Sequence, residues 1–213
     1  MFTGDEFADG GEFIAETFEK KKCNASFFFT GRFFEQPEFK QLIGRLYRDG
    51  HYIGPHSYGH LLYCDWTNRD SLLIDESTFR DDLQKNSEVI KNMGIDFSGR
   101  RYFIPPYEWY NDSISQWSER MGFTLFNMTP GLRTSADYTT PDMKNYRGSE
   151  EIYSSFLQVE KLNPNGLNGF IILIHIGTDP RRTDKFYFYL PRMIDDLRSK
   201  GYRFKTIPEL LGR

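Results

Sequence analysis

The sequence is poor in cysteine, with only Cys23 and Cys64 among 213 residues. Two cysteines form neither a zinc-finger pattern nor a disulfide framework, so we expect both to be free and largely buried. No run of about 18 apolar residues occurs, which argues against a transmembrane helix. The net charge of -3 gives no sign of an electrostatic nucleic-acid binder.

Aromatic residues are abundant, with 20 Phe and 13 Tyr. Most are expected in the core, and a few would suit a sugar-binding cleft. The length fits one large domain or two small ones, and we assign residues 1–213 to a single domain. No signal-peptide pattern precedes the first chemistry-bearing residues, which follow Met1 almost at once. We therefore expect a fragment or part of a larger multidomain protein, and the compartment stays open.

Helix-type and strand-type segments alternate along the chain. Phe39, Leu42 and Leu46 show the helical spacing of apolar residues, and Gly50 ends that segment. This pattern predicts helices over 11–22, 37–49, 78–93, 111–121 and 191–200. Strands are predicted before Asp5 and over 25–30, 51–54, 101–104, 123–126, 169–175 and 202–206.

The alternation predicts the α/β class with a mostly parallel sheet. About seven such units favour a distorted (β/α) barrel that is TIM-barrel-like. Residues 129–149 are rich in Pro, Gly, Thr and Asp, and we interpret them as a long loop of the kind that is often functional.

Only four histidines are present: His51, His56, His60 and His175. His56 and His60 are four residues apart, just after a predicted strand. If that segment turns helical, both imidazoles lie on one face and can share a metal ion. Taken alone, the spacing is equally compatible with two ordinary surface or core histidines.

Asp5 and Glu6 follow the first predicted strand, where both side chains could reach a site over a barrel mouth. Two acids and two histidines would supply three ligands and one base, and three protein ligands with an open position are the usual pattern of a catalytic metal site. By itself the acidic pair is more often a solvated turn. His175 ends the most apolar strand, at the functional rim of a barrel or as a satisfied core histidine.

A rigid turn at Pro105, Pro106 and Tyr107 could aim the Tyr107 N–H at a developing oxyanion. The simpler alternative for these residues is a strand terminator. Trp109, Tyr110, Trp66 and the 129–149 loop are candidates for a sugar cleft, although both tryptophans suit a core equally well.

Together these motifs resemble the polysaccharide deacetylases of the NodB-homology type, which form carbohydrate esterase family 4. The resemblance covers nearly the whole chain. It is most specific over residues 24–31 and 50–60, where order, spacing and residue types agree. Thr3–Glu6, Ile104–Asn111 and Leu173–His175 match further motifs of the family.

The resemblance implies a role for each candidate residue. Asp5 corresponds to the general base, His175 to the general acid and the Tyr107 N–H to the oxyanion donor. The implied metal ligands are Glu6, His56 and His60, with Zn²⁺ as the first choice and Co²⁺ or Ni²⁺ as substitutes. Pro106, Trp109 and Asp137 are assigned to substrate binding. His51 matches a structural position and is left out of the site.

The sequence departs from the family pattern in three ways. Glu6 replaces an aspartate, and Ile104 stands where the family has an arginine that positions the base. The acidic group that tunes the catalytic histidine is not obvious, and Asp137 is our best candidate for it.

The implied reaction is metal-dependent removal of N- or O-linked acetyl groups from a carbohydrate polymer or oligomer, and family context favours an extracytoplasmic site. A deacetylase-derived carbohydrate-binding module with little or no activity is the main alternative. A metal-dependent amidohydrolase acting on a small non-sugar amide is a third possibility.

Overall fold

The structure is a computed structural model that describes residues 1–96 and 98–212. Four strands form a parallel sheet in the order β3-β2-β1-β6: β3 (Tyr52–Pro55), β2 (Ser26–Phe29), β1 (Phe2–Gly4) and β6 (Ile174–His175). The strands β4 (Arg101–Phe103) and β5 (Phe123–Leu125) form a second parallel pair. The predicted α/β class with parallel strands is therefore confirmed.

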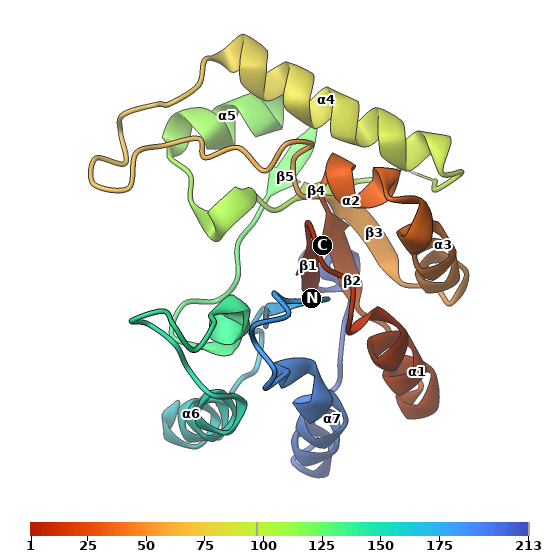
Figure 1. Cartoon of the computed structure of the whole chain (residues 1–213), viewed down its shortest axis with the longest axis vertical. Coiled ribbons are helices and arrows are strands. Elements are labelled where there is room, and N and C mark those ends of the chain that lie inside the picture. Colours follow the sequence, from red (N-terminus) through yellow and green to blue (C-terminus); the bar gives the residue numbers. More distant parts are fainter. Residues whose placement is uncertain (97, 213) are drawn as a thin grey trace.

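Contacts outside the strand ladders join the two sheets. On one side, the Tyr102 N–H of β4 donates to the Tyr52 hydroxyl of β3 at 3.1 Å. On the other side, the Thr129 N–H beyond β5 donates to the Ile171 carbonyl ahead of β6 at 3.0 Å. The strands thus follow one another around a distorted ring, with the longer helices outside it (Figure 1).

Two apolar layers pack against the strands. The inner cluster lies between the two sheets and contains Phe28, Tyr102, Ile104, Phe126, Leu173 and Ile207. Helix α8 (Ile207–Leu211) contributes to it, and the Ile207 N–H donates to Ser26 Oγ at 2.8 Å. A capping box between Thr206 and Glu209 begins this helix.

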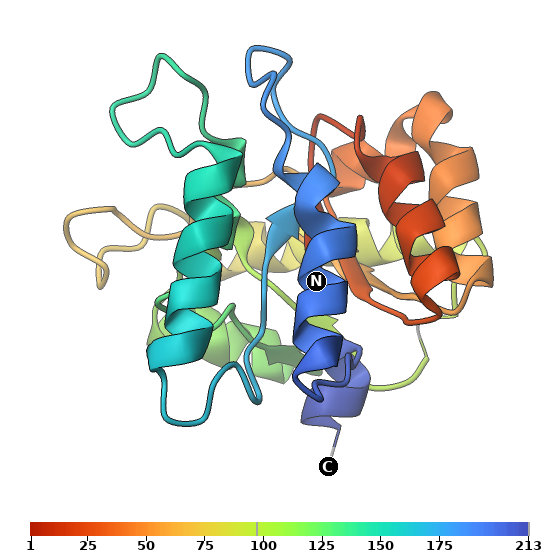
Figure 2. The ribbon, with the colours of Figure 1, turned by 90° about the horizontal axis from the view of Figure 1, so that it is seen from below.

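The larger cluster lies between the strands and the outer helices. These helices are α1 (Gly11–Lys21), α2 (Gly31–Glu35), α3 (Lys40–Arg48), α4 (Glu76–Asn92), α5 (Asp112–Arg120), α6 (Ser149–Leu162) and α7 (Leu190–Ser199). Figure 2 shows α1, α6 and α7 side by side over the sheet that contains β1. None of the described helices is long and apolar enough to cross a membrane.

Several predicted elements need correction. The predicted strand 169–175 is reduced to Ile174–His175, and 202–206 forms no strand because Thr206 instead caps α8. Helix α6 was not predicted, although Ile152, Tyr153 and Phe156 give it a buried face. Cys23 and Cys64 are free, and of the two only Cys64 is fully buried.

A cavity of about 750 Å³ opens near the beginnings of the strands, beside Met1, Asn24 and Tyr202. The predicted site residues follow the opposite, carboxyl ends of the strands. Asp5 follows β1, His56 follows β3, Tyr107 follows β4, and His175 ends β6. In parallel α/β proteins this is the edge where catalytic groups gather.

Candidate active site

His56 and His60 lie together after β3, with ring centroids 5.1 Å apart. The segment that contains His56 and His60 is not helical, so helical spacing does not explain why the two rings meet. Left-handed backbone at Ser57 (φ 68°) and His60 (φ 54°) brings the two rings together instead. Asp82 of α4 holds the turn, because its carboxylate accepts from the N–H groups of Tyr58 and Gly59, each at 2.8 Å.

The environments of His56 and His60 favour the neutral form of both imidazoles. His56 is buried, and its Nδ1 lies 2.9 Å from the Ile104 carbonyl oxygen. Since a carbonyl only accepts, Nδ1 carries the proton and Nε2 keeps a free lone pair. Burial lowers the pKa of His56 well below its ordinary value. Burial also lowers the pKa of His60 to about 4, although the nearby Asp5 carboxylate acts in the opposite direction.

Asp5 faces this pair from the end of β1, with Oδ2 4.0 Å from His60 Nδ1. Both of its carboxylate oxygens are engaged. Oδ1 accepts from the Thr30 hydroxyl at 2.8 Å, and Oδ2 accepts from Arg32 Nη2 at 2.7 Å. Thr30 caps α2 and Arg32 lies in its first turn. A short helix after β2 therefore fixes the orientation of Asp5.

Arg32 was not singled out from the sequence. Ile104 stands at the family's arginine position, and its side chain is buried in the inner cluster. Arg32 instead reaches the carboxylate from a different strand end. The contact spans 27 residues, so it could not be recognised from a local motif. A polar residue directly after the Thr30-Gly31 turn was the only available signal.

Glu6 is exposed, in the bend that follows β1. Within residues 1–96 and 98–212, no three His, Cys, Asp or Glu side chains converge closely enough to hold an ion. The predicted ligand set is thus brought together only in part, with His56 and His60 paired and Asp5, not Glu6, beside them. Two neutral imidazoles next to a carboxylate still match the donor chemistry that zinc prefers.

His175 is paired with Asp137. His175 Nδ1 lies 2.6 Å from Asp137 Oδ1, and the His175 backbone N–H donates to Asp137 Oδ2 at 2.9 Å. Asp137 is 1% exposed. Burial acts to lower the pKa of His175. The charge and hydrogen bond of Asp137 and the charge of Glu108 act in the opposite direction, and the net result is a pKa above the ordinary value.

Tyr107 and Glu108 adopt consecutive left-handed conformations (φ 58° and 53°) after Pro105 and Pro106. In the described part of the chain, no acceptor meets the Tyr107 N–H. The Tyr107 ring lies 4.5 Å from the His60 ring. Burial raises the pKa of Glu108 to about 7, with Asp137 acting in the same direction and His175 opposing it. Glu108 is a further acid in the site that sequence reasoning missed.

The structure also shows the surroundings of Pro106, Trp109 and His51. Pro106 is buried within the same turn as Tyr107. Trp109 is half-buried, and its Nε1 donates to the Asp65 carbonyl at 3.2 Å. His51 is buried away from the rim, where its Nδ1 accepts from the Ala25 N–H at 3.1 Å.

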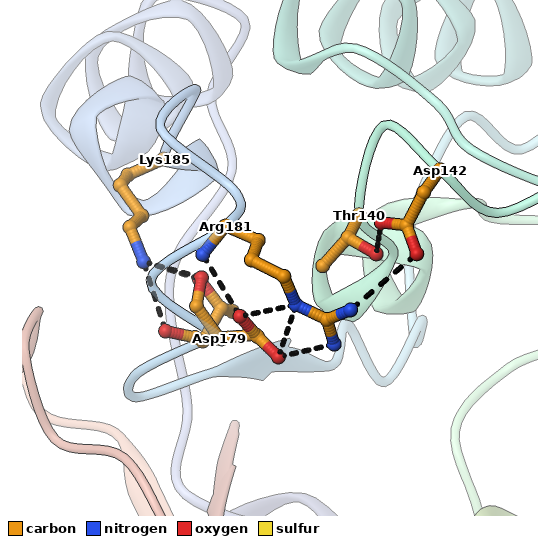
Figure 3. A network of polar contacts seen from close by, with 6 residues as sticks. Thr140, Asp142, Asp179, Arg181 and Lys185 are labelled. Atoms are coloured by element: carbon orange, nitrogen blue, oxygen red, sulfur yellow. Dashed lines mark hydrogen bonds and ion pairs between the residues drawn. The ribbon is translucent and has the colours of Figure 1, made fainter.

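The segment that contains Asp137 is tied to the 177–185 segment by two arginines. Arg182 is fully buried and donates to the Thr139 carbonyl at 2.7 Å and to Ser149 Oγ at 3.1 Å. Arg181 is exposed and joins Asp179 to Asp142 (Figure 3). Because His175 lies just before the 177–185 segment, these contacts support the His175–Asp137 pair.

Replacing Arg182 with methionine should destabilise the fold by about 2–4 kcal/mol, because the Thr139 carbonyl would be left buried without its donor. Urea unfolding measures the change, and Arg181→Met is the matched control. We expect the control to lie within about 0.5 kcal/mol of the parent, since Arg181 is 62% exposed. Equal losses in the two variants would contradict a supporting role for Arg182.

Fold and site together define an α/β protein in which paired neutral histidines, an oriented carboxylate and a His–Asp pair share one edge. The chain belongs to the polysaccharide deacetylase family, whose model matches residues 8–126. That stretch includes His56, His60 and Tyr107. Asp5, Glu6, Asp137 and His175 lie outside it.

Among its relatives is a peptidoglycan-N-acetylmuramic acid deacetylase of Bacillus subtilis, 28% identical over 202 residues. The match covers 93% of this chain and 65% of the relative, so the chain spans just under two thirds of that protein's length. A chitin deacetylase of Colletotrichum lindemuthianum is 24% identical, with 93% of this chain and 73% of the relative covered.

Solved structures share the fold. A peptidoglycan N-acetylglucosamine deacetylase superposes with a TM-score of 0.74 at 18% identity, covering 98% of this chain and 86% of that one. A family 4 pseudoenzyme from Bacillus anthracis gives a TM-score of 0.68 at 22% identity, with 99% and 64% covered. An acetyl xylan esterase of the same family from Clostridium thermocellum, in complex with cobalt, gives 0.71 at 20% identity, with 99% and 89% covered.

Proposed function

We propose that this chain removes acetyl groups from a carbohydrate polymer or oligomer, with the help of a divalent metal ion, Zn²⁺ first. The observation that carries the proposal is the gathering of Asp5, the neutral His56–His60 pair and the His175–Asp137 pair at one rim. His56 and His60 would hold the ion. Glu6 would have to turn inward to join them.

When bound, such an ion supplies an acidified water and a polarised acetyl carbonyl. Asp5, held by Thr30 and Arg32, is placed to take the proton of the attacking water. The free Tyr107 N–H is placed to donate to the oxyanion. His175 is kept protonated by Asp137 on Nδ1 and delivers the proton on Nε2 to the leaving amine or alkoxide.

The substrate class rests on the relatives. The names of the similar proteins include peptidoglycan and chitin deacetylases, and one solved structure is an acetyl xylan esterase. An acetylated carbohydrate outside the cytoplasm is therefore our proposal for this chain. A bifunctional xylanase/deacetylase of Pseudobutyrivibrio xylanivorans aligns with this chain, and the match covers 27% of the length of that relative. This supports the proposal that this domain belongs to a larger protein.

Acetate release from chitin oligomers, peptidoglycan fragments and acetylated xylan tests the proposal. Each substrate is incubated with added Zn²⁺, Co²⁺ or Ni²⁺, or with a chelator. We expect release from at least one substrate that the chelator abolishes and added metal restores. Release that is the same with chelator and with metal would refute metal dependence.

A catalytically weak carbohydrate-binding module is the second candidate, favoured by the exposed Glu6 and by the pseudoenzyme with the same fold. It predicts binding of one of these substrates with no acetate release under any condition. A small non-sugar amide as substrate predicts release from an acetylated arylamine and from none of the three carbohydrates.

A further inference from the structure

A rigid loop after the histidine pair presents an exposed tryptophan. Trp66 is 54% exposed, although a large apolar ring favours burial. Its loop is internally hydrogen-bonded: the Asp65 N–H donates to the Ser71 carbonyl, and Asp65 Oδ1 accepts from the Thr67 N–H. The loop therefore holds its shape without burying Trp66, and it projects beside α5 (Figure 1).

Trp109 lies between the loop that carries Trp66 and the rest of the protein. Its indole N–H is bound to the Asp65 carbonyl at 3.2 Å, and the Arg69 guanidinium covers its ring at 4.0 Å. The Trp66 ring lies 5.7 Å from the Trp109 ring, tilted by 33°. Trp109 is thus engaged by protein groups, and Trp66 is the ring that remains available on the outside.

Tyr107 links this pair to the proposed reaction centre. Its ring centroid lies 5.5 Å from that of Trp66 and 4.5 Å from that of His60. Tyr107 is 45% exposed. A row of aromatic rings therefore leads outward from the histidine pair, and we call Trp66, Tyr107 and Trp109 the aromatic row.

We propose that the aromatic row is a subsite in which Trp66 stacks on a pyranose ring next to the one that bears the reacting acetyl group. A pyranose with equatorial substituents has a flat C–H face that suits an exposed indole, in the way apolar groups pack on aromatic faces. This inference rests on the proposed function and deepens it. It makes the substrate an oligomer or polymer of such sugars, and a single acetylated sugar a poor one.

The test compares Trp66→Ala, Trp66→Phe and the parent in binding to chitotetraose and to N-acetylglucosamine. Binding is measured by calorimetry with chelator present, so that turnover does not interfere. We expect Trp66→Ala to weaken tetramer binding about tenfold, Trp66→Phe to restore most of it, and monomer binding to stay unchanged. Phe188→Ala is the control, because Phe188 is 56% exposed and packs on Phe13 of α1.

Acetylated xylotetraose serves as a second probe, because xylose is also an all-equatorial pyranose. If the parent binds one of the two tetramers more tightly and Trp66→Ala loses that preference, the preferred tetramer shows which sugar Trp66 stacks on. Equal affinities of Trp66→Ala and the parent for both tetramers would overturn the inference, and so would a parent that binds neither. The proposed function fails by a separate result, which is the absence of metal-dependent acetate release from the parent.

Discussion

Replacing Asp137 with asparagine is expected to lower the kcat of acetate release about 100-fold and to move the basic limb of its pH profile to lower pH. Asp137 raises the pKa of His175 by its charge and by a 2.6 Å contact with Nδ1. Without the carboxylate, burial becomes the dominant influence and the pKa of His175 falls. A smaller fraction of His175 is then protonated at neutral pH, so the leaving group lacks its proton donor.

The pH dependence of kcat in the parent and the variant measures this effect. Asp142→Asn is a matched control, because Asp142 belongs to the same segment but is 62% exposed and bound to Arg181. We expect the control to keep the parent profile. A basic limb at the same pH in Asp137→Asn and the parent would show that His175 is not the acid tuned by Asp137.

Replacing Arg32 with glutamine should lower kcat by roughly 10–100-fold with little change in KM. Arg32 holds one oxygen of Asp5 and Thr30 holds the other. Loss of the guanidinium frees the carboxylate to rotate, and small displacements of a catalytic group are costly to the rate. Arg32 is not part of the aromatic row, which is why KM should stay close to its parent value.

Arg32→Lys should recover part of the rate, and added guanidinium ion should partly rescue Arg32→Gln. Arg120→Gln is the control, because Arg120 forms an ion pair with Glu76 on the outer helices. A merely structural role for Arg32 would not respond to guanidinium. An unchanged kcat in Arg32→Gln would remove Arg32 from the site.

The fold was largely predictable because the outer helices bury one apolar stripe each. Leu42 and Leu46 of α3 show that stripe in the sequence. The prediction failed where a segment follows a tertiary contact. Residues 202–206 have a strand-like composition, but Thr206 bonds to Glu209 and begins α8. Helix α6 was overlooked because it directly follows the polar loop and its N-cap residue, Gly148, has no side chain to mark the helix start.

Site residues that belong to one short sequence motif were predictable. Contacts between residues far apart in the sequence were not. His56 and His60 belong to one motif, and the structure places them together. Their meeting arises from left-handed backbone, which residue spacing does not reveal. The Asp5–Arg32 and His175–Asp137 contacts join residues 27 and 38 positions apart. Glu6 shows the opposite case, since a motif position did not ensure an inward side chain.

The measurement that tests the central claim most directly is acetate release by the parent beside Asp5→Asn and His175→Ala, each loaded with Zn²⁺. Neither substitution removes a member of the histidine pair, so bound metal is measured in all three proteins as a check on folding. We predict that the parent releases acetate at least about 100-fold faster than either variant. The same background rate in all three proteins, with equal metal content, would contradict a catalytic role for this rim.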